Sequence, residues 1–332
     1  MTKKVAVLTS GGDAPGMNAC IRAIVLACER ADYSVLGYMH GFNGLLHQEY
    51  RLLDGRSVHN LIQQGGTMLR SARCKEFEGR EEAKRAADNL RQLEVDTLII
   101  IGGDGSFRGA VHLSQFWEGQ LLGLPGTIDN DIQGTDVTIG YHTAIETAVT
   151  SIDKVRDTAD SFERIFLVEV MGRRAGFLGL NAALASAADY VILPELFESE
   201  EQTLEAIMQQ LTKRRRERGD VSYIIVLAEN LWPKGVNDLA EQLTKLTESE
   251  VKPVILGHVQ RGGSPVSQDR LLATRLGAYA VSLVGSDISG IMIGECHGKP
   301  VKVPLPSTWQ KRKPLDEFTV STMESLMNNR YA

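Results

Sequence analysis

Cysteine and long apolar runs are scarce in this sequence. Four cysteines occur among 332 residues, and none has the C-x-x-C spacing of a zinc or redox motif. No stretch reaches about 18 consecutive apolar residues, so no membrane-spanning helix is expected. The apolar run near the N-terminus is too short for a secretion signal. These absences favour a cytoplasmic protein without a membrane partner.

An excess of positive charge is also missing. Lysine and arginine number 36 against 42 aspartates and glutamates, which gives a formal net charge of −6. Such a chain is a poor candidate for a general nucleic-acid binder, and any basic site must be local. Apolar residues make up 43% of the chain and charged residues 23%, which excludes wholesale disorder, collagen and a coiled coil.

Low-complexity segments and Gly/Ser-rich linkers are absent. Instead, short apolar runs alternate with segments of helical periodicity, such as residues 21–28 and 236–243. Strands buried on both faces give such runs, and their alternation with helices predicts mostly parallel sheets with helices on both faces. The expected strands are 5–9, 35–39, 97–101, 121–124, 165–171, 190–193, 223–228, 254–256 and 290–293. So many strands exceed one typical sheet, and we predict an α/β fold of two lobes.

Two glycine-rich loops follow expected strands. Residues 11–18 open a helix, where glycines allow a ligand to approach the backbone and the helix N-terminus attracts an anion. A tight turn is the alternative, because the Lys-Ser/Thr of a Walker loop is missing. Residues 102–106 place Asp104 among glycines. A bare carboxylate would repel phosphate, so Asp104 is expected either to hold a Mg²⁺ ion that phosphate also binds or to cap the next helix.

A third loop, residues 125–131, contains Asp129 and Asp131. Side chains two residues apart in an extended segment can point the same way, so one acid can serve as a base while the other supports a metal. Asp- and Asn-rich turns are also common without any function. The position after another sheet strand favours the functional interpretation.

Several arginines lie at strand ends or beside glycines. They are Arg73, Arg164, Arg173 and Arg261. Arginines in such places are typical anion-binding forks. The basic cluster at residues 213–218 is instead expected to be a solvated helix end. A metal, a carboxylate base and a cationic cradle together predict a Mg²⁺-dependent kinase of a small hydroxyl substrate.

In these motifs the chain resembles bacterial ATP-dependent 6-phosphofructokinases. The matching segments, in the family's order, are residues 8–18, 102–106, 125–131, 168–173 and 257–265. The resemblance implies transfer of the γ-phosphate of ATP to the 1-hydroxyl of fructose 6-phosphate in glycolysis. It also implies a homotetramer with active sites shared between subunits. Its phosphofructokinase-like fold would have a larger ATP-binding lobe (1–139 plus 256–309) and a smaller fructose 6-phosphate lobe (140–255 plus 310–332).

The resemblance assigns ligands residue by residue. ATP would contact Gly12, Arg73, Cys74, Gly103, Asp104, Gly105 and Ser106, with Mg²⁺ beside Asp104. Fructose 6-phosphate would contact Thr127, Ile128, Asp129, Met171, Gly172, Arg173, Glu229, His258, Val259, Gln260 and Arg261. Arg164 and Lys252 would reach in from a neighbouring subunit, although the family usually has Arg at the second position. Asp129 would be the base, Arg73 and Arg173 would balance charge, and Thr127 would position the phosphoryl group.

The resemblance implies a second, effector-binding site only in part. In bacterial relatives an intersubunit site binds ADP as activator and phosphoenolpyruvate as inhibitor. Its residues correspond here to Arg22, Arg56, Arg156 and Asp189, of which Arg56 is displaced by one position and Asp189 replaces Glu. Leu26 replaces a further arginine, and Asp220 puts an acid where the family has lysines. We therefore predict weak or absent control by these two effectors.

Three other functions compete with this interpretation. Pyrophosphate-dependent phosphofructokinases typically carry Asp and Lys where this chain has Gly105 and Gly126, so ATP is favoured as the donor. A non-catalytic regulatory subunit would be favoured by loss of Asp104 or Asp129, and both are present. NAD kinases and lipid kinases share only the glycine pattern around Asp104 and would need neither residues 127–131 nor 258–264.

Overall fold

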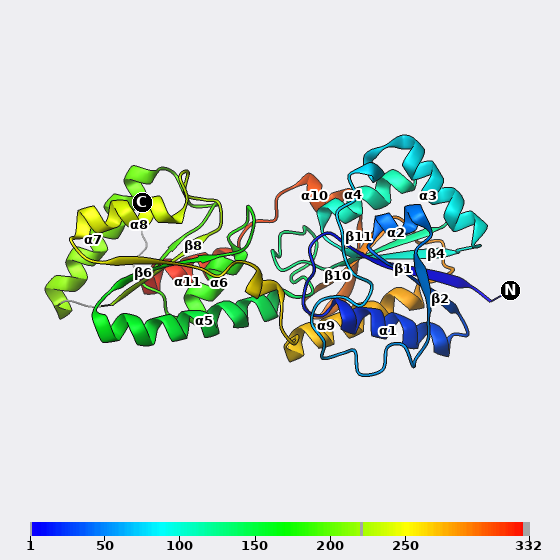
Figure 1. The fold of residues 1–332 in the computed structure, drawn as a ribbon, viewed down its shortest axis with the longest axis horizontal. Coiled ribbons are helices and arrows are strands. Elements are labelled where there is room, and N and C mark those ends of the chain that lie inside the picture. Colours follow the sequence, from blue (N-terminus) through cyan, green and yellow to red (C-terminus); the bar gives the residue numbers. More distant parts are fainter. Residues whose placement is uncertain (1, 220–221, 328–332) are drawn as a thin grey trace. The chain divides into compact units, whose positions relative to one another are not determined.

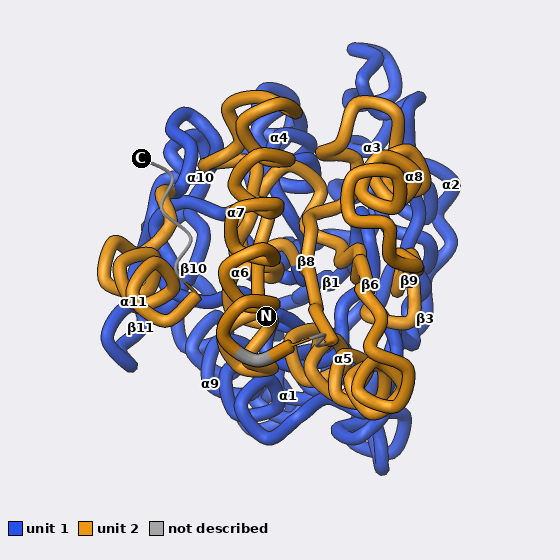
Figure 2. The backbone as a smooth tube through the Cα atoms, turned by 90° about the vertical axis from the view of Figure 1, so that its left-hand side faces the viewer, with its two compact units in different colours: residues 1–128, 132–143, 261–313 blue, residues 129–131, 144–260, 314–332 orange. Residues whose placement is uncertain are grey.

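The computed structural model describes residues 2–219 and 222–327 of the chain. They form two compact units, which are coloured separately in Figure 2. Unit 1 comprises Met1–Ile128, Ile132–Thr143 and Arg261–Lys313, and unit 2 comprises Asp129–Asp131, Ala144–Gln260 and Pro314–Ala332. The division into an ATP lobe and a sugar-phosphate lobe stays a prediction, because it is defined by ligands.

Unit 1 contains a seven-stranded sheet in the order β11-β10-β5-β4-β1-β2-β3. Its strands are β1 (Lys4–Ser10), β2 (Ser34–Tyr38), β3 (Tyr50–Leu53), β4 (Thr97–Gly102), β5 (Gln120–Pro125), β10 (Ile291–Cys296) and β11 (Lys299–Pro304). All pairings from β10 to β2 are parallel, whereas the edge strands β3 and β11 are antiparallel. The sequence prediction missed both edge strands, because their mostly exposed residues give no apolar run.

Helices cover both faces of this sheet. Figure 1 shows α1 (Met17–Arg30) and α9 (Ser267–Ser282) on one face, and α2 (Phe42–His47), α3 (Arg80–Gln92) and α4 (Asp104–Leu113) on the other. Ala6 and Leu8 of β1 belong to the core under α2, α3 and α4. Val5 and Val7 alternate with them and are equally buried. Burial on both faces explains why β1 reads as an unbroken apolar run.

Unit 2 contains a four-stranded, fully parallel sheet in the order β7-β8-β6-β9. Its strands are β6 (Ile165–Val170), β7 (Tyr190–Ile192), β8 (Tyr223–Ala228) and β9 (Val251–Ile255). One face packs against α7 (Glu200–Arg218) and α8 (Val236–Thr247), and the other carries α5 (Tyr141–Phe162) and α6 (Phe177–Ala185) (Figure 1). α11 (Glu317–Met327) contacts α6.

All nine expected strands are present, and the predicted α/β class with mostly parallel sheets is confirmed. The prediction was least accurate at β9, which begins at Val251 rather than at residue 254. The cause is Lys252 and Pro253, which interrupt the apolar run although they lie in the strand. No described helix has the length and apolar character needed to cross a membrane.

Candidate functional site

The strand order of unit 1 reverses beside β1. β2 and β3 lie on one side of β1, and β4, β5 and β10 lie on the other. Open α/β sheets bind ligands beyond the carboxyl ends of the strands at such a reversal. Ser10 at the end of β1 pairs with Gly102 at the end of β4. The two glycine-rich loops predicted from sequence therefore leave the sheet side by side.

The loop after β1 is tightly packed. Gly16, at the N-cap of α1, has φ = 112°, and a Cβ there would lie 2.8 Å from Ile139 Cγ2, so only glycine fits. A Cβ on Gly12 would overlap the guanidinium of Arg261, which donates to the carbonyl of Asp13 at 3.1 Å. The Arg261 side chain, assigned above to the sugar phosphate, thus lies against the first glycine-rich loop.

The segment that leads to Arg73 and Cys74 is held in the same region by two side-chain hydrogen bonds. Ser71 Oγ donates to the carbonyl of Gly11 at 2.5 Å, and Thr9 Oγ1 donates to the carbonyl of Arg70 at 2.8 Å. These bonds fix the segment that leads to Arg73 beside the end of β1. Arg73 is exposed and Cys74 is half-buried.

Asp104 is the first residue of α4 and is preceded by Gly103 as the N-cap. Its Oδ1 accepts the N–H of Gly105 at 2.7 Å, and its Oδ2 lies 3.8 Å from Nε of Arg108. The Arg108 guanidinium stacks on Trp309, 4.8 Å from the ring centroid. Trp309 belongs to the C-terminal segment outside the matching motifs. Asp104 lies in the first turn of α4, where the helix dipole stabilises the negative charge of an acid and the carboxylate stays within reach of a cation.

Ser106 supplies a second sign of a ligand site. Its side chain is 4% exposed, and its Oγ has no hydrogen-bond partner among the described residues. A Cβ on Gly11 would lie 3.5 Å from this oxygen. A buried hydroxyl without a partner is costly unless a ligand satisfies it. Asp104 contributes a single carboxylate here, and among the described residues no group of three or more acidic, His or Cys side chains could hold a metal ion by itself.

The third loop continues from β5 at the same sheet edge. The Gly126 N–H donates to the carbonyl of Gly102 at 3.0 Å, and a Cβ on Gly103 would lie 3.9 Å from Cβ of Thr127. Thr127 and Asp129 are 8% and 6% exposed, and Ile128 is fully buried. The structure therefore brings Gly126 and Thr127 of the predicted catalytic loop beside the loop that carries Asp104.

The predicted sugar-phosphate residues of unit 2 gather at the carboxyl edge of its sheet. The residues Met171, Gly172 and Arg173 follow β6, Glu229 follows β8, and His258, Val259 and Gln260 follow β9. The Arg173 N–H donates to Oε1 of Glu229 at 2.9 Å. Gln260 is fully buried, and neither atom of its amide has a hydrogen-bond partner among the described residues. Burial, and then the charge of Glu229, raise the pKa of the neighbouring Glu169.

Arg164 and Lys252 meet at one carboxylate. Arg164 Nε lies 2.5 Å from Oε2 of Glu250, and Lys252 Nζ lies 2.6 Å from Oε1 of the same residue. Lys252 lies on β9, and Arg164 directly precedes the neighbouring strand β6, whose Phe166 pairs with Lys252. The pairing of Glu250 with Lys252 and Arg164 lowers the pKa of its carboxyl. The sequence prediction named both cations but not the acid between them.

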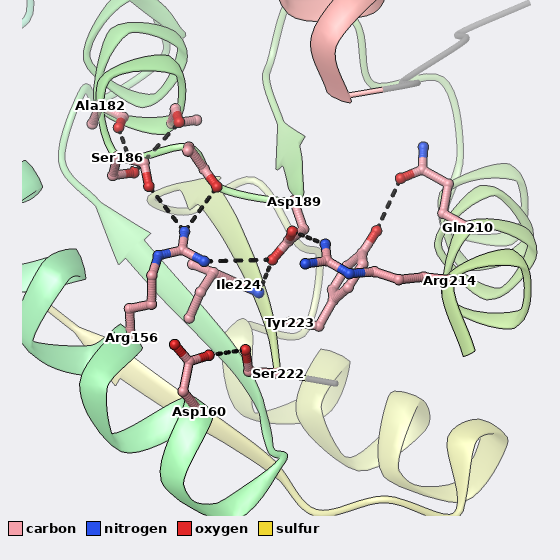
Figure 3. Close-up of polar contacts among 12 residues, drawn as sticks. Arg156, Asp160, Ala182, Ser186, Asp189, Gln210, Arg214, Ser222, Tyr223 and Ile224 are labelled. Atoms are coloured by element: carbon pink, nitrogen blue, oxygen red, sulfur yellow. Dashed lines mark hydrogen bonds and ion pairs between the residues drawn. The ribbon is translucent and has the colours of Figure 1, made fainter. Parts of the chain in front are cut away.

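The effector residues belong to different units. Arg22 on α1 and the exposed Arg56 lie in unit 1, whereas Arg156 and Asp189 lie in unit 2. Figure 3 shows Asp189 between two arginines: Arg214 donates to Oδ1, and Arg156 Nη1 lies 4.0 Å from Oδ2. Oδ2 also accepts the N–H of Ile224 at 2.8 Å. Asp220, which the sequence argument invoked, lies outside the described residues.

The interpretation of residues 213–218 as a solvated helix end was wrong for two of its members. Arg214 contacts Asp189, and Arg215 donates to Ser249 Oγ and to the carbonyl of Thr247. Both side chains are half-buried, because α7 lies across the sheet and its last turns face β8 and α8. Lys213 and Arg216 are exposed as expected.

Sequence reasoning missed the residues that support the loops. Ser71 fixes Gly11, Ile139 forms a β-bridge with Gly126, and Thr138 Oγ1 donates to the carbonyl of Thr127 at 2.6 Å. Asp269 on α9 is completely buried. The one available signal was an acid among apolar helix residues, since buried carboxylates need partners.

Known proteins resemble this chain over nearly all of its length. It is 44% identical over 325 residues to ATP-dependent 6-phosphofructokinase 2 of Bacteroides thetaiotaomicron, covering 98% of each chain. It is 43% identical over 314 residues to ATP-dependent 6-phosphofructokinase 1 of Thermus thermophilus, covering 95% of this chain and 96% of the other.

Solved structures of phosphofructokinases also resemble this chain. The phosphofructokinase of Saccharomyces cerevisiae matches with a TM-score of 0.85 at 34% identity, over 99% of this chain and 47% of the yeast chain. A pyrophosphate-dependent enzyme from Marinobacter aquaeolei matches with a TM-score of 0.83 at 19% identity, over 98% of this chain and 91% of that one, which shows a shared fold alone. The family model described as Phosphofructokinase matches residues 4–284. The chain therefore belongs to the phosphofructokinase family.

Proposed function

We propose that this chain transfers the γ-phosphate of ATP to the 1-hydroxyl of fructose 6-phosphate, as an ATP-dependent 6-phosphofructokinase of glycolysis. The observation that carries the proposal is the meeting of three loops beyond β1, β4 and β5, which brings together Gly11, Ser106 and Thr127. Relatives of 40% to 46% identity that bear this enzyme's name support it.

Asp129 is the proposed general base. Its carboxylate takes the proton of the sugar 1-hydroxyl while that oxygen attacks the γ-phosphorus in line. Thr127 positions the transferring group, and Arg73 and Arg173 balance its negative charge. Glu229 accepts hydrogen bonds from sugar hydroxyls. Its orientation is supported by the N–H of Arg173, which donates to Oε1 at 2.9 Å.

Mg²⁺ is the proposed cofactor, held by Asp104 together with phosphate oxygens and water. When bound, the cation neutralises charge on the β- and γ-phosphates. The chain itself orients the carboxylate through the N–H of Gly105 at 2.7 Å. Arg108, at 3.8 Å, keeps a positive charge beside Asp104. The Ser106 hydroxyl, which has no hydrogen-bond partner among the described residues, supplies a donor for a phosphate oxygen.

We place the enzyme in the cytoplasm as a homotetramer in which Arg164 and Lys252 bind the 6-phosphate of the sugar held by a neighbouring subunit. Their convergence on Glu250 supports a common anion site, because two cations held within contact of one carboxylate can also contact one phosphate.

The preference for ATP over pyrophosphate as the phosphoryl donor is inferred from two glycines. A Cβ on Gly105 would meet nothing within 4 Å, so a larger residue there would project into open space beside Asp104. A Cβ on Gly126 would lie 3.0 Å from both Ile101 Cγ2 and Met17 Cε, so a side chain there would need its neighbours to move. Glycine at both positions leaves room for the nucleotide.

The test is a coupled assay of fructose 6-phosphate phosphorylation with ATP or pyrophosphate as donor. We expect turnover with ATP and at most a small fraction of it with pyrophosphate. Equal turnover with pyrophosphate, or no turnover with ATP, would overturn the proposal. Gly105→Asp should weaken ATP use sharply, whereas Gly105→Asn, of the same size without the charge, should weaken it far less. Equal effects would show that space rather than charge matters at this position.

A further inference from the structure

Asp269 is a buried carboxylate to which the proposed mechanism gives no role. It lies on the first turn of α9, four residues beyond the end of the 257–265 motif, and is 0% exposed. Its Oδ1 accepts the N–H of Gly140 at 2.9 Å. Its Oδ2 accepts the N–H of Thr143 at 2.7 Å and the Thr143 hydroxyl at 2.5 Å. Burial raises the pKa of this carboxyl, and the three hydrogen bonds oppose that rise.

The partners of Asp269 lead to the catalytic loop. Gly140 directly precedes α5 and Thr143 lies in its first turn, whose N–H groups have no partners within the helix. Ile139, next to Gly140, donates to the carbonyl of Pro125 at 2.8 Å and accepts the N–H of Thr127 at 3.2 Å. Asp269 therefore anchors the backbone segment that pairs with residues 125–127.

Asp269 also lies near two further segments, the 257–265 motif and the first glycine-rich loop. The Thr143 hydroxyl accepts the N–H of Val266, which directly follows Pro265 of the 257–265 motif. A Cβ on Gly16, in the first glycine-rich loop, would lie 3.6 Å from Asp269 Cβ. A Cβ on Gly140 would lie 2.6 Å from Ala14 Cβ in that loop. Three active-site segments thus pack around one buried acid within unit 1.

We propose that Asp269 is a positioning residue, which holds the 125–127 backbone, the loop after β1 and the start of α9 in register for phosphoryl transfer. The proposal rests on the function proposed above. Asp269 touches no reacting atom. Its effect on rate arises because a displacement of about 1 Å in a catalytic group can cost roughly 10²-fold.

The first test is Asp269→Asn, which keeps the shape but places an amide NH₂ against one of the N–H donors. We expect kcat with ATP to fall by roughly 10- to 100-fold, with the KM for fructose 6-phosphate changing less than about threefold. The stoichiometry of ATP binding should stay near that of the wild type, which shows that the lost rate does not come from unfolded protein.

Asp316, directly before α11, offers a matched control. Asp316 Oδ1 accepts the N–H and the hydroxyl of Thr319, the same kinds of bond that Asp269 makes to Thr143. Asp316→Asn should leave kcat unchanged, because the two bonds of the Asp316 carboxylate are both to Thr319 in the first turn of α11. If Asp269→Asn fails to fold, Thr143→Val and Thr143→Ser replace it: Val should lose the rate and Ser should restore it.

The outcomes separate the two proposals. A wild type that does not phosphorylate fructose 6-phosphate overturns the proposed function and removes the basis for the positioning role. An active wild type together with a folded Asp269→Asn variant that keeps more than about half of kcat overturns the positioning role alone. Equal rates for Thr143→Val and Thr143→Ser would also overturn it.

Discussion

Arg164 directly precedes β6, Lys252 lies on the neighbouring parallel strand β9, and the two side chains contact the two oxygens of one carboxylate, that of Glu250. Arg164 also stacks on Phe162, with its guanidinium 4.4 Å from the ring centroid. Glu250 holds the two long side chains together, but it also occupies them. An anion that binds both cations must therefore displace or share this carboxylate.

The first prediction concerns Glu250. Glu250→Gln should lower the half-saturating concentration of fructose 6-phosphate by roughly two- to fivefold, on the scale of exposed ion pairs, because the competing negative charge is gone. The kcat should change little. Glu248 is also exposed and lies two positions before Glu250. Glu248→Gln removes the same charge and should leave the saturation curve unchanged. An equal shift in both variants would indicate a general charge effect rather than competition at Arg164 and Lys252.

Lys252 itself gives the second prediction. Lys252→Ala should raise the half-saturating fructose 6-phosphate concentration with kcat little changed, because the ε-ammonium is a compact charge that binds phosphate in ground and transition states alike. Lys252→Arg should restore tight binding. Steady-state kinetics of the three proteins decides the matter. If Lys252→Ala moves neither parameter, this residue is not a phosphate ligand.

Asp129 gives the third prediction. Asp129→Asn should lower kcat by at least ~10²–10⁴, the usual span for loss of a general base. The KM for fructose 6-phosphate should move far less, since the proton is transferred only in the transition state. A variant that is folded and keeps more than about a tenth of the wild-type kcat would argue decisively against Asp129 as the base.

The sequence predicted nine of the eleven described strands and the loops that follow them, but not the contacts between distant residues. The apolar runs of β1, β4 and β5 are read easily because both faces of the sheet are covered. Their loops meet because parallel strands present their carboxyl ends at one edge. By contrast, the bonds of Asp269 to Gly140 and Thr143 join residues more than 120 positions apart. Local pattern carries no information on such pairs.

Local sequence pattern is equally uninformative about which charged side chains form contacts. The basic run on α7 is compatible with a solvated helix end, and nothing in its spacing distinguishes Arg214 from Arg216. Only the packing of α7 over the sheet places Arg214 beside Asp189, while Arg216 remains exposed. Glu250 was missed for a similar reason, because its partner Arg164 is distant in the chain and lies beside it only through the pairing of β6 with β9.

The last prediction is that ADP and phosphoenolpyruvate control this enzyme weakly or not at all. The resemblance to bacterial phosphofructokinases implies a phosphate-binding arginine where this chain has Leu26, and it implies that Arg56 is displaced by one position. Each lost charge-assisted hydrogen bond costs about 1.5–3 kcal/mol, so two losses weaken effector binding by roughly 10²–10⁴-fold. The structure adds a second reason. The Asp189 carboxylate is already engaged by Arg214 and the Ile224 N–H, and Arg156 donates to the carbonyls of Ser186 and Ala187.

An effector would have to break these contacts before it gained its own. Separating this half-buried ion pair is unfavourable because it leaves the Asp189 charge uncompensated, so the Arg214–Asp189 pair opposes any cation or phosphate that competes for either group. The measurement is the fructose 6-phosphate saturation curve with and without each effector at millimolar concentration. Its midpoint should stay within about twofold. A several-fold shift caused by either effector, and abolished by Arg22→Ala, would show that the site still functions and that the engaged Asp189 does not prevent effector binding.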